Sequence, residues 1–468
     1  MKRFLKTLSF GCIAVVVLVL IVATLLESLY GSSFAIDNIY HSSWFIALWA
    51  LLAVTAMMYI IYTSRRTTLV MLHASFVVIL LGALVSFATS KQGSIAIAHE
   101  GAPASMFTTP EGTLEKLPFR LLLAELETIY PNNGETPIDY VATVIVDDRK
   151  ELHTHTVSLN SPMKVSGYRF CIRGVSEENL SLTVSHDIYG RPISYAGYFL
   201  VFLSFLLLFF DRHSGFCCTL QLLKGAGETN SIIEEKDCSR SNNIVKRTTG
   251  ALLCVIIPTG LLWYRRGMFP ATNGTEALML LAAIIAAITI ALGNKSRFTS
   301  LRRALAVAAC ISAAIALCGL GGEDDVQPIL RTPLLGVHVT TIIIAYALLA
   351  CTAANAVIAL CTRNTKRRAQ QALLGRVLLY PATMLLATGI FIGAVWADIS
   401  WGRYWGWDPK EVWALITLLV CSVAFHTRSL RFMARPTTFH LFCIVTFAAV
   451  LFTYFGVNYL LGGLHSYM

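Results

Sequence analysis

Residues 9–29 read SFGCIAVVVLVLIVATLLESL, an apolar run preceded by the basic residues Lys2, Arg3 and Lys6. A helix needs about 20 mostly apolar residues to cross a bilayer, and this run is long enough. No small-residue cleavage site follows it, so we expect a retained anchor. Similar runs recur along the chain and predict eleven membrane-spanning helices, near 9–29, 43–63, 69–89, 194–211, 248–264, 277–293, 304–320, 336–361, 377–396, 411–427 and 437–459.

The composition of the 468-residue chain agrees with these spans. Hydrophobic residues make up 56% and charged residues only 14%, and the mean hydropathy is +0.64. Soluble domains carry about 25% charged residues, so a soluble enzyme is excluded. The net charge of +10 has a simpler source than nucleic-acid binding, because lysines and arginines flank membrane spans on the cytoplasmic side. A nucleic-acid partner is therefore excluded as well.

The distribution of basic residues predicts the orientation of the spans. If the N-terminus is cytoplasmic, the segments on that side hold 23 lysines and arginines, whereas the short outer loops hold five. Short cytoplasmic loops are normally the richer ones in Lys and Arg. We therefore expect a cytoplasmic N-terminus and a C-terminus on the outer side.

The loops divide the chain into parts. Segment 90–193 has the alternating apolar pattern of strands, as in DYVATVIVDD, and predicts a small β-rich domain on the outer side. The polar linker 212–247 separates a four-span front part, 1–211, from a seven-span back part, 248–468. The predicted fold class is a polytopic α-helical membrane protein with a small β-rich periplasmic domain.

Tryptophan is concentrated in one predicted outer loop. Five of the eight tryptophans fall between Trp396 and Trp413, in WADISWGRYWGWDPKEVW. An aromatic belt at the membrane interface explains one or two tryptophans per helix end. A denser cluster forms a rigid apolar surface that suits a large planar ligand. Ligand binding and belt packing both remain open on this pattern alone.

The sequence DPKE inside this loop is typical of a helix start. Asp408 is a good N-cap, Pro409 a good first helical residue, and Glu411 occupies the capping-box position. We expect these residues mainly to begin the tenth span. Arg403 and Lys410 are two of the five basic residues in the short outer loops, and each suits either a ligand carboxylate or a lipid phosphate.

Four histidines form two pairs when they are placed by depth. His73 lies about 25 Å and His426 about 22 Å below the outer edge, at 1.5 Å per helical residue. His338 opens the eighth span and His465 follows the eleventh, so both lie at the outer surface. Intramembrane histidines are usually functional, and two pairs fit two six-coordinate haem positions, although each histidine alone is also compatible with a structural role. His440 is interpreted as structural.

Several motifs together resemble a known family. WGRYWGWDPKEVWALITLL (401–419) resembles the WWD motif of the haem-handling proteins that include CcsA, CcmC and CcmF. The segments around His338 and His465 resemble the CcsA-type outer histidine segments. The front part resembles ResB (CcsB), as in LHASFVVILLGALVS (72–86) and HDIYGRPISYAGYFL (186–200). The chain thus resembles a fused System II cytochrome c synthase of the CcsBA type.

This resemblance implies a route for haem b (iron protoporphyrin IX). His73 and His426 would ligate its iron within the membrane, and His338 and His465 would hold it at the outer WWD loop, 396–413. Apocytochrome c would then bring a CxxCH segment whose thiols add to the haem vinyl groups. The residues implied in haem contact or catalysis are His73, His338, Trp396, Trp401, Arg403, Tyr404, Trp405, Trp407, Asp408, His426 and His465.

The resemblance also implies a location and partners. The expected location is the bacterial cytoplasmic (inner) membrane, and the partners are haem, apocytochrome c, membrane lipid and a periplasmic thioredoxin-like thiol reductant. Two alternatives remain: a haem exporter or relay without lyase activity, as in the CcmC type, and a membrane b-type dihaem electron carrier. The ResB-like front part favours the synthase, because it accompanies synthases rather than relays.

Overall fold

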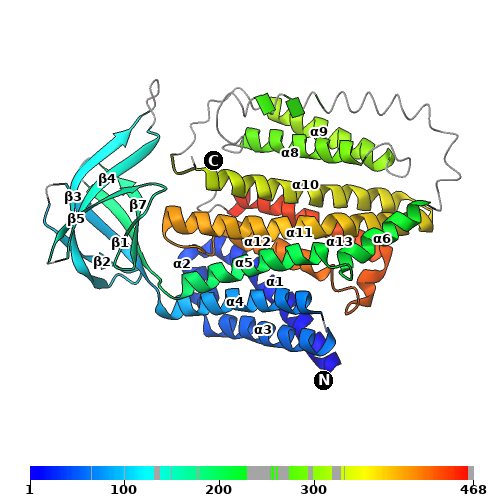
Figure 1. Cartoon of the computed structure of the whole chain (residues 1–468), viewed down its shortest axis with the longest axis horizontal. Coiled ribbons are helices and arrows are strands. Elements are labelled where there is room, and N and C mark those ends of the chain that lie inside the picture. Colours follow the sequence, from blue (N-terminus) through cyan, green and yellow to red (C-terminus); the bar gives the residue numbers. More distant parts are fainter. Residues whose placement is uncertain are drawn as a thin grey trace.

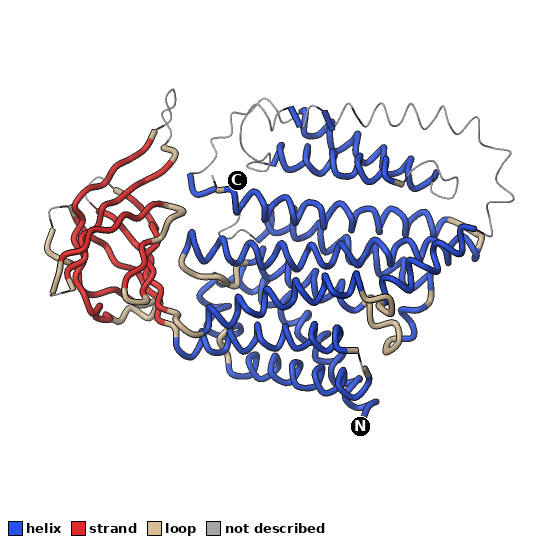
Figure 2. Tube along the Cα trace, viewed as in Figure 1, coloured by secondary structure: helices blue, strands red, loops and turns tan. Residues whose placement is uncertain are grey.

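Apolar helices account for most of the described chain. The computed structural model describes residues 1–64, 66–99, 101–130, 137–148, 150–176, 179–228, 274–292, 299–318, 328–330 and 332–461, with a few single residues between 253 and 261. The helices form one bundle, and the strands form a separate domain at one end of it (Figure 1, Figure 2). We call this end of the bundle the β-domain end.

The helices keep the chain order of the predicted spans. In the front part they are α1 (Lys2–Tyr30), α2 (Ser32–Ala35), the π-helical turn η1 (Ile36–Tyr40), α3 (Ser43–Thr63), α4 (Thr67–Thr89), α5 (Gly190–Phe210) and α6 (Gly215–Glu228). In the back part they are α8 (Gly274–Ala291), α9 (Thr299–Cys318), η4 (Pro328–Leu330), α10 (Pro333–Cys361), α11 (Thr365–Trp401), α12 (Pro409–Val423), η5 (Arg431–Ala434), α13 (Pro436–Leu451) and η6 (Phe452–Leu461).

The chain is a multi-pass membrane protein. Among the described residues, eight helical segments are long and apolar enough to cross a membrane. Helices α8 and α12 coincide with the predicted spans at 277–293 and 411–427 but are shorter than a full span. The predicted span at 248–264 lies almost wholly outside the described residues.

Two predicted boundaries near the candidate site were wrong. Helix α11 does not end near Trp396 but continues to Trp401, where Gly402 takes the left-handed conformation with φ 80°. Residues at the end of α11 are buried, and a helix satisfies their backbone groups internally. The loop between α11 and α12 is therefore 402–408 rather than 396–413, and Trp396 is a helical residue.

The second correction concerns His426, which was placed inside the tenth span. Helix α12 ends at Val423, and His426 lies in the turn that follows. Its backbone N–H donates to the Val423 carbonyl, 3.1 Å away, and its carbonyl accepts from the Leu430 N–H at 2.7 Å. The apolar pattern runs past Val423, so hydropathy alone did not reveal this turn.

The β-rich domain predicted at 90–193 is confirmed as one antiparallel sheet. Its strands are β1 (Lys91–Ala98), β2 (Ala104–Thr108), β3 (Leu114–Ile129), β4 (Asp139–Asp147), β5 (Leu152–Ser158), β6 (Met163–Val165), β7 (Tyr168–Val175) and β8 (Asn179–His186). The order in the sheet is β5-β4-β3-β2-β1-β8-β7-β6. The first and last strands in sequence pair along their length, from Lys91 with His186 to Ala98 with Asn179. The chain therefore leaves the helix bundle and returns to it at one place.

Helices α4 and α5 continue from these paired strands and pack closely together. A Cβ added to Gly82 on α4 would lie 2.4 Å from the Ser194 Oγ, and one added to Gly197 on α5 would lie 2.5 Å from the Ile79 side chain. Such contacts are possible only because these positions are glycine, and small residues commonly permit close packing of membrane helices. The β domain is thus anchored on a tight pair of helices.

Candidate functional site

The structure brings His73 and His426 together. Their ring centroids are 6.1 Å apart, with perpendicular ring planes. The Nδ1 of His73 bonds the Leu69 carbonyl at 2.8 Å, and the Nδ1 of His426 bonds the Ser422 carbonyl at 2.9 Å. A carbonyl only accepts, so each Nδ1 carries the proton and each Nε2 keeps the lone pair that binds a metal.

The pair offers two neutral imidazoles in edge contact, and each Nε2 would be available to hold an iron. Imidazole nitrogen is a common ligand of haem iron and binds first-row metals at about 2 Å. No group of three or more His, Cys, Asp or Glu side chains with metal-site geometry occurs among the described residues. A pair of imidazoles is sufficient where a porphyrin supplies the other four ligands.

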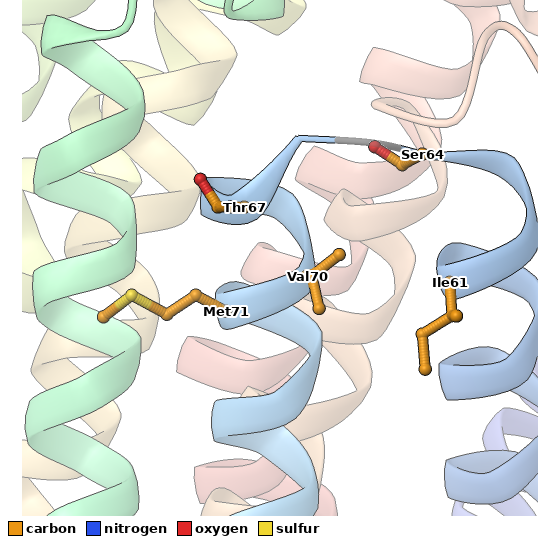
Figure 3. Close-up of a pocket in the computed structure, with 5 residues that line it drawn as sticks. All are labelled: Ile61, Ser64, Thr67, Val70 and Met71. Carbon is orange, nitrogen blue, oxygen red and sulfur yellow. The ribbon is translucent and has the colours of Figure 1, made fainter.

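The pair lies at the end of the bundle opposite to the β domain. His73 is in the second turn of α4, which starts at Thr67. The rings of Phe10 on α1 and His426 are in edge-to-face contact, with centroids 5.3 Å apart. Near the pair lies an open pocket of ≈ 400 Å³ between the ends of α3 and α4. Figure 3 shows its lining residues, Ser64 and Met71 among them. None of the predicted site residues lines this pocket, so we do not include it in the site.

Trp396 and Trp401 are at the other end of the bundle, in the last turns of α11. Their rings pack edge to face with centroids 4.8 Å apart, and Trp396 is buried with Leu330 and Leu335. The Trp396 Nε1 is buried without a hydrogen-bond partner. Trp396 is therefore part of a small hydrophobic core next to the loop between α11 and α12.

The loop 402–408 is held by aromatic and hydroxyl contacts to the front part of the chain. Trp407 stacks on Tyr40 of η1 at 4.5 Å with nearly parallel rings, and it meets Trp405 at 5.8 Å and a right angle. The Tyr404 hydroxyl bonds the Ser86 Oγ at 2.8 Å. Trp407 has φ 58°, which is unusual for a bulky residue and is maintained by these contacts.

The predicted helix start at DPKE is confirmed. The Asp408 side chain accepts from the Lys410 N–H at 3.0 Å, and Glu411 accepts from the Asp408 N–H, which completes a capping box. Glu411 also accepts from the Gly406 N–H at 2.8 Å, so one carboxylate joins the loop to α12. Asp408 thus has a clear structural role.

The two basic residues of this region have different environments. The Lys410 Nζ bonds the Asn458 side chain of η6 at 3.0 Å. The Arg403 guanidinium lies over Gly406, where an added Cβ would be 3.0 Å from its central carbon. The Arg403 guanidinium therefore packs against the backbone of its own loop.

His338 lies on α10 against a glycine surface of α11. Its Nδ1 bonds the Gly389 carbonyl at 2.7 Å, and a Cβ on Gly393 would lie 2.5 Å from its ring. Gly393 is less than one turn from Trp396, so His338 is near residues 396–407, which hold four tryptophans and which we call the tryptophan segment. His465, its predicted partner, lies outside the described residues. His440 is buried; its Nε2 bonds the Arg368 carbonyl at 3.2 Å, and its Nδ1 has no hydrogen-bond partner among the described residues.

A buried ionic cluster at Asp398 was not predicted from the sequence. Asp398 is fully buried and forms ion pairs with Arg169 of β7 and with Arg191 of α5, at 3.0 Å for the latter. The Tyr195 hydroxyl donates to the same carboxylate at 2.6 Å. Asp398 in WADISW and Arg191 in GRPISY are charged residues in otherwise apolar stretches, and this is a signal that the sequence offers. Their pairing could not be predicted, because they are 207 residues apart in the chain.

Cys171 lies beside Asp398 where the end of α11 meets the β domain, a contact that we call the junction. We predict that Cys171 resists alkylation. Its thiol donates to the Ile399 carbonyl at 3.4 Å, and burial raises the pKa of Cys171 to about 12. At pH 8 only about one thiol in 10⁴ is then the reactive thiolate. Iodoacetamide followed by peptide mass spectrometry should label the exposed Cys218 and leave Cys171 unlabelled until the protein is denatured. Equal labelling of both cysteines in the native protein would contradict the packing of this junction.

Comparison with known proteins agrees with these features. The cytochrome C assembly protein family model matches residues 271–465, and the ResB-like family model matches residues 62–260. The chain is 30% identical over 273 residues to the cytochrome c biogenesis protein CcsA of Marchantia polymorpha, covering 46% of this chain and 84% of that protein. It is 33% identical over 229 residues to CcsA of Chlamydomonas reinhardtii, covering 44% of this chain and 62% of that protein.

A third relative is matched more closely over a shorter stretch. Protein NrfI of Wolinella succinogenes is 49% identical over 83 residues, which is 18% of this chain and 9% of that protein. The chain thus belongs to the CcsA family of cytochrome c biogenesis proteins, with a role in cytochrome c maturation, and it joins a ResB-like part and a CcsA-like part in one fused polypeptide of the CcsBA type.

Proposed function

We propose that this protein is a holocytochrome c synthase that moves haem b across the bacterial inner membrane and attaches it to apocytochrome c. The observation that carries the proposal is the His73–His426 pair, with centroids 6.1 Å apart and both Nδ1 atoms engaged by backbone carbonyls. Two neutral imidazoles whose Nε2 atoms keep their lone pairs would suit a porphyrin iron. We assign this pair to the entry of haem from the cytoplasmic side.

In this proposal the haem is next held at the β-domain end of the bundle. His338 and His465 are its ligands there, and Trp401, Trp405, Trp407 and Tyr404 provide aromatic surface. Support comes from the position of His338 beside the end of α11 and from the fixed loop aromatics. Arg403 is assigned to a haem propionate, and Asp408 acts by holding the loop on α12.

The proposed reaction is the addition of two thiols to two vinyl groups. For each bond, the cysteine sulfur joins the vinyl carbon next to the ring, and a proton equivalent to that of the thiol ends on the terminal carbon. No net oxidation or reduction occurs in the addition. The protein's contribution is to hold the vinyl carbons beside the CxxCH thiols, which converts a loose encounter into a fixed one. The CxxCH histidine replaces one of the outer ligands.

The orientation and partners follow from the same proposal. The excess of basic residues in the short loops on one side supports a cytoplasmic N-terminus and a periplasmic C-terminus. The β domain then faces the periplasm, where apocytochrome c is delivered. Its cysteines must arrive as thiols, so we infer a periplasmic thioredoxin-like reductant as an additional partner.

Expression with an apocytochrome in a bacterium that lacks its own maturation pathway tests this function. We expect a haem-stained cytochrome band that survives denaturing electrophoresis. A membrane protein that purifies with haem but yields no covalent product would identify a relay instead of a synthase. Two haems that stay bound and are reversibly reduced, without any export or product, would identify a b-type electron carrier.

A further inference from the structure

The two parts of the chain meet at a carboxylate with no solvent exposure. Asp398 lies one turn before the end of α11, between Trp396 and Trp401 in sequence. Both of its side-chain oxygens are occupied: Oδ1 accepts from the Arg191 Nε at 3.0 Å, and Oδ2 accepts from Arg169 and from the Tyr195 hydroxyl. The Arg169 Nη1 also donates to the Asp398 backbone carbonyl at 3.0 Å.

The residues that follow Asp398 also contact the β domain. The Ile399 carbonyl accepts from Cys171, and the Ser400 hydroxyl donates to the Asn160 side chain at 2.9 Å. A Cβ on Gly402 would lie 3.4 Å from the Cys171 Sγ and 3.5 Å from Thr183. Positions 398 to 402 at the end of α11 therefore contact strand β7, the turn at Asn160 and strand β8, and Figure 1 shows this end of α11 beside the domain.

We propose that Asp398 is a positioning residue that sets the orientation of the β domain and of the tryptophan segment relative to each other. The inference rests on the proposed function, because the tryptophan segment is the outer haem site in that proposal. Arg169 lies on strand β7 of the domain, and Arg191 lies on helix α5, which follows the domain in the chain. The Asp398 carboxylate therefore holds the domain and α5 to the end of α11. The charge is required because an uncharged side chain satisfies two guanidinium groups poorly in a buried place.

These contacts fix the position of the β domain relative to the tryptophan segment. The tryptophan segment is joined to the domain on one side by Asp398. On the other side, the Tyr404 hydroxyl bonds Ser86 of α4 and Ser194 of α5, the two helices that carry the domain. In the proposed function, an apocytochrome c segment that contacts the β domain would then meet the loop at a constant distance. Loss of the carboxylate releases one of these two attachments.

A disulfide reporter measures the docking directly. A cysteine introduced by Gly402→Cys has its Cβ close to the native Cys171 Sγ, and in a disulfide a Cβ lies about 3 Å from the partner sulfur. A protease site inserted in the linker 212–247 separates the two parts on a denaturing gel unless the disulfide joins them. Cys171→Ser in the reporter protein is the negative control. The left-handed backbone at Gly402 strains any side chain, but it does so equally in every variant compared.

Cross-linking is measured as the fraction of disulfide-joined protein at equilibrium with a glutathione redox buffer, because the rate would report the exposure of the buried Cys171 thiol and not the docking. We expect Asp398→Asn to lower the effective concentration of the two thiols at least tenfold. The control Asp148→Asn, which removes an exposed carboxylate of the same domain, should leave it unchanged. Tyr195→Phe retains both ion pairs and should lower it a few-fold, and this variant is used if Asp398→Asn does not accumulate. Values within twofold of the parent for the Asp398 and Tyr195 variants would overturn the proposal. This arm needs no haem, so it is independent of the proposed function.

The second arm uses the chain with Gly402 intact and reads the haem site. We expect Asp398→Asn to alter the absorption spectrum of haem bound at the outer site and to reduce covalent cytochrome at least fivefold. Haem held by His73 and His426 should be retained. If docking is lost while the spectrum and the yield stay as in the parent, Asp398 only joins the two parts, and the positioning role is overturned.

Discussion

His73→Gly should abolish haem retention at the inner pair and reduce covalent cytochrome at least tenfold. The reason is that His426 alone offers a single imidazole, and no third metal-binding side chain joins the pair among the described residues. Glycine also leaves space for an added imidazole. Free imidazole in the medium should therefore restore haem loading, measured as the haem-to-protein ratio and absorption spectrum of the purified protein.

The matched control is His213→Ala, which removes an exposed histidine near the same end of the bundle as His73. It should leave haem content and cytochrome yield unchanged. A His73→Gly protein that retains its haem, or one that stays empty at every imidazole concentration while remaining folded in the membrane, would show that His73 is structural. His426→Gly should behave in the same way as His73→Gly, because the two rings have equivalent hydrogen bonds.

The membrane helices could be predicted because their signal is local. A run of about 20 apolar residues marks a span wherever it occurs, and α1, α3 and α4 cover the predicted runs closely. The inner histidines could be related by depth because the rise per helical residue is constant. That argument brought His73 and His426 to one level even though His426 lies in a turn after α12 rather than in the helix.

The contacts of the outer region could not be predicted, because they join residues far apart in sequence. The stack of Trp407 on Tyr40 and the pairing of Asp398 with Arg169 each depend on the packing of the ResB-like part against the CcsA-like part. Local patterns carry no information about such partners. For the same reason Trp396 was assigned to a loop, since the burial that keeps it helical comes from the tertiary structure.

Gly393→Ala should displace His338 and reduce covalent cytochrome at least tenfold. The added methyl group would lie 2.5 Å from the imidazole Cε1 and 2.7 Å from Nδ1, closer than real Cβ contacts occur. The ring has little freedom to move, because its Nδ1 bonds the Gly389 carbonyl at 2.7 Å. Overpacking of this kind costs about 1–3 kcal/mol, which is enough to break one hydrogen bond. Haem at the inner pair should be retained, since His73 and His426 lie at the other end of the bundle.

Two control variants separate the position of the histidine from the packing of the helices. Gly375→Ala places a methyl group 3.0 Å from the Cε1 of Phe439 and 3.3 Å from the Nδ2 of Asn355, so it crowds α11 against its neighbours without meeting His338 or Gly389. Gly11→Ala meets nothing within 4 Å. We expect cytochrome yields in the order Gly11→Ala, Gly375→Ala, Gly393→Ala, because contacts of 3.0 Å are relieved by small side-chain shifts whereas the bonded ring of His338 cannot relieve one of 2.5 Å. Equal yields from Gly393→Ala and Gly11→Ala would remove His338 from the outer site, because a ligand displaced from its hydrogen bond cannot hold iron in the same geometry.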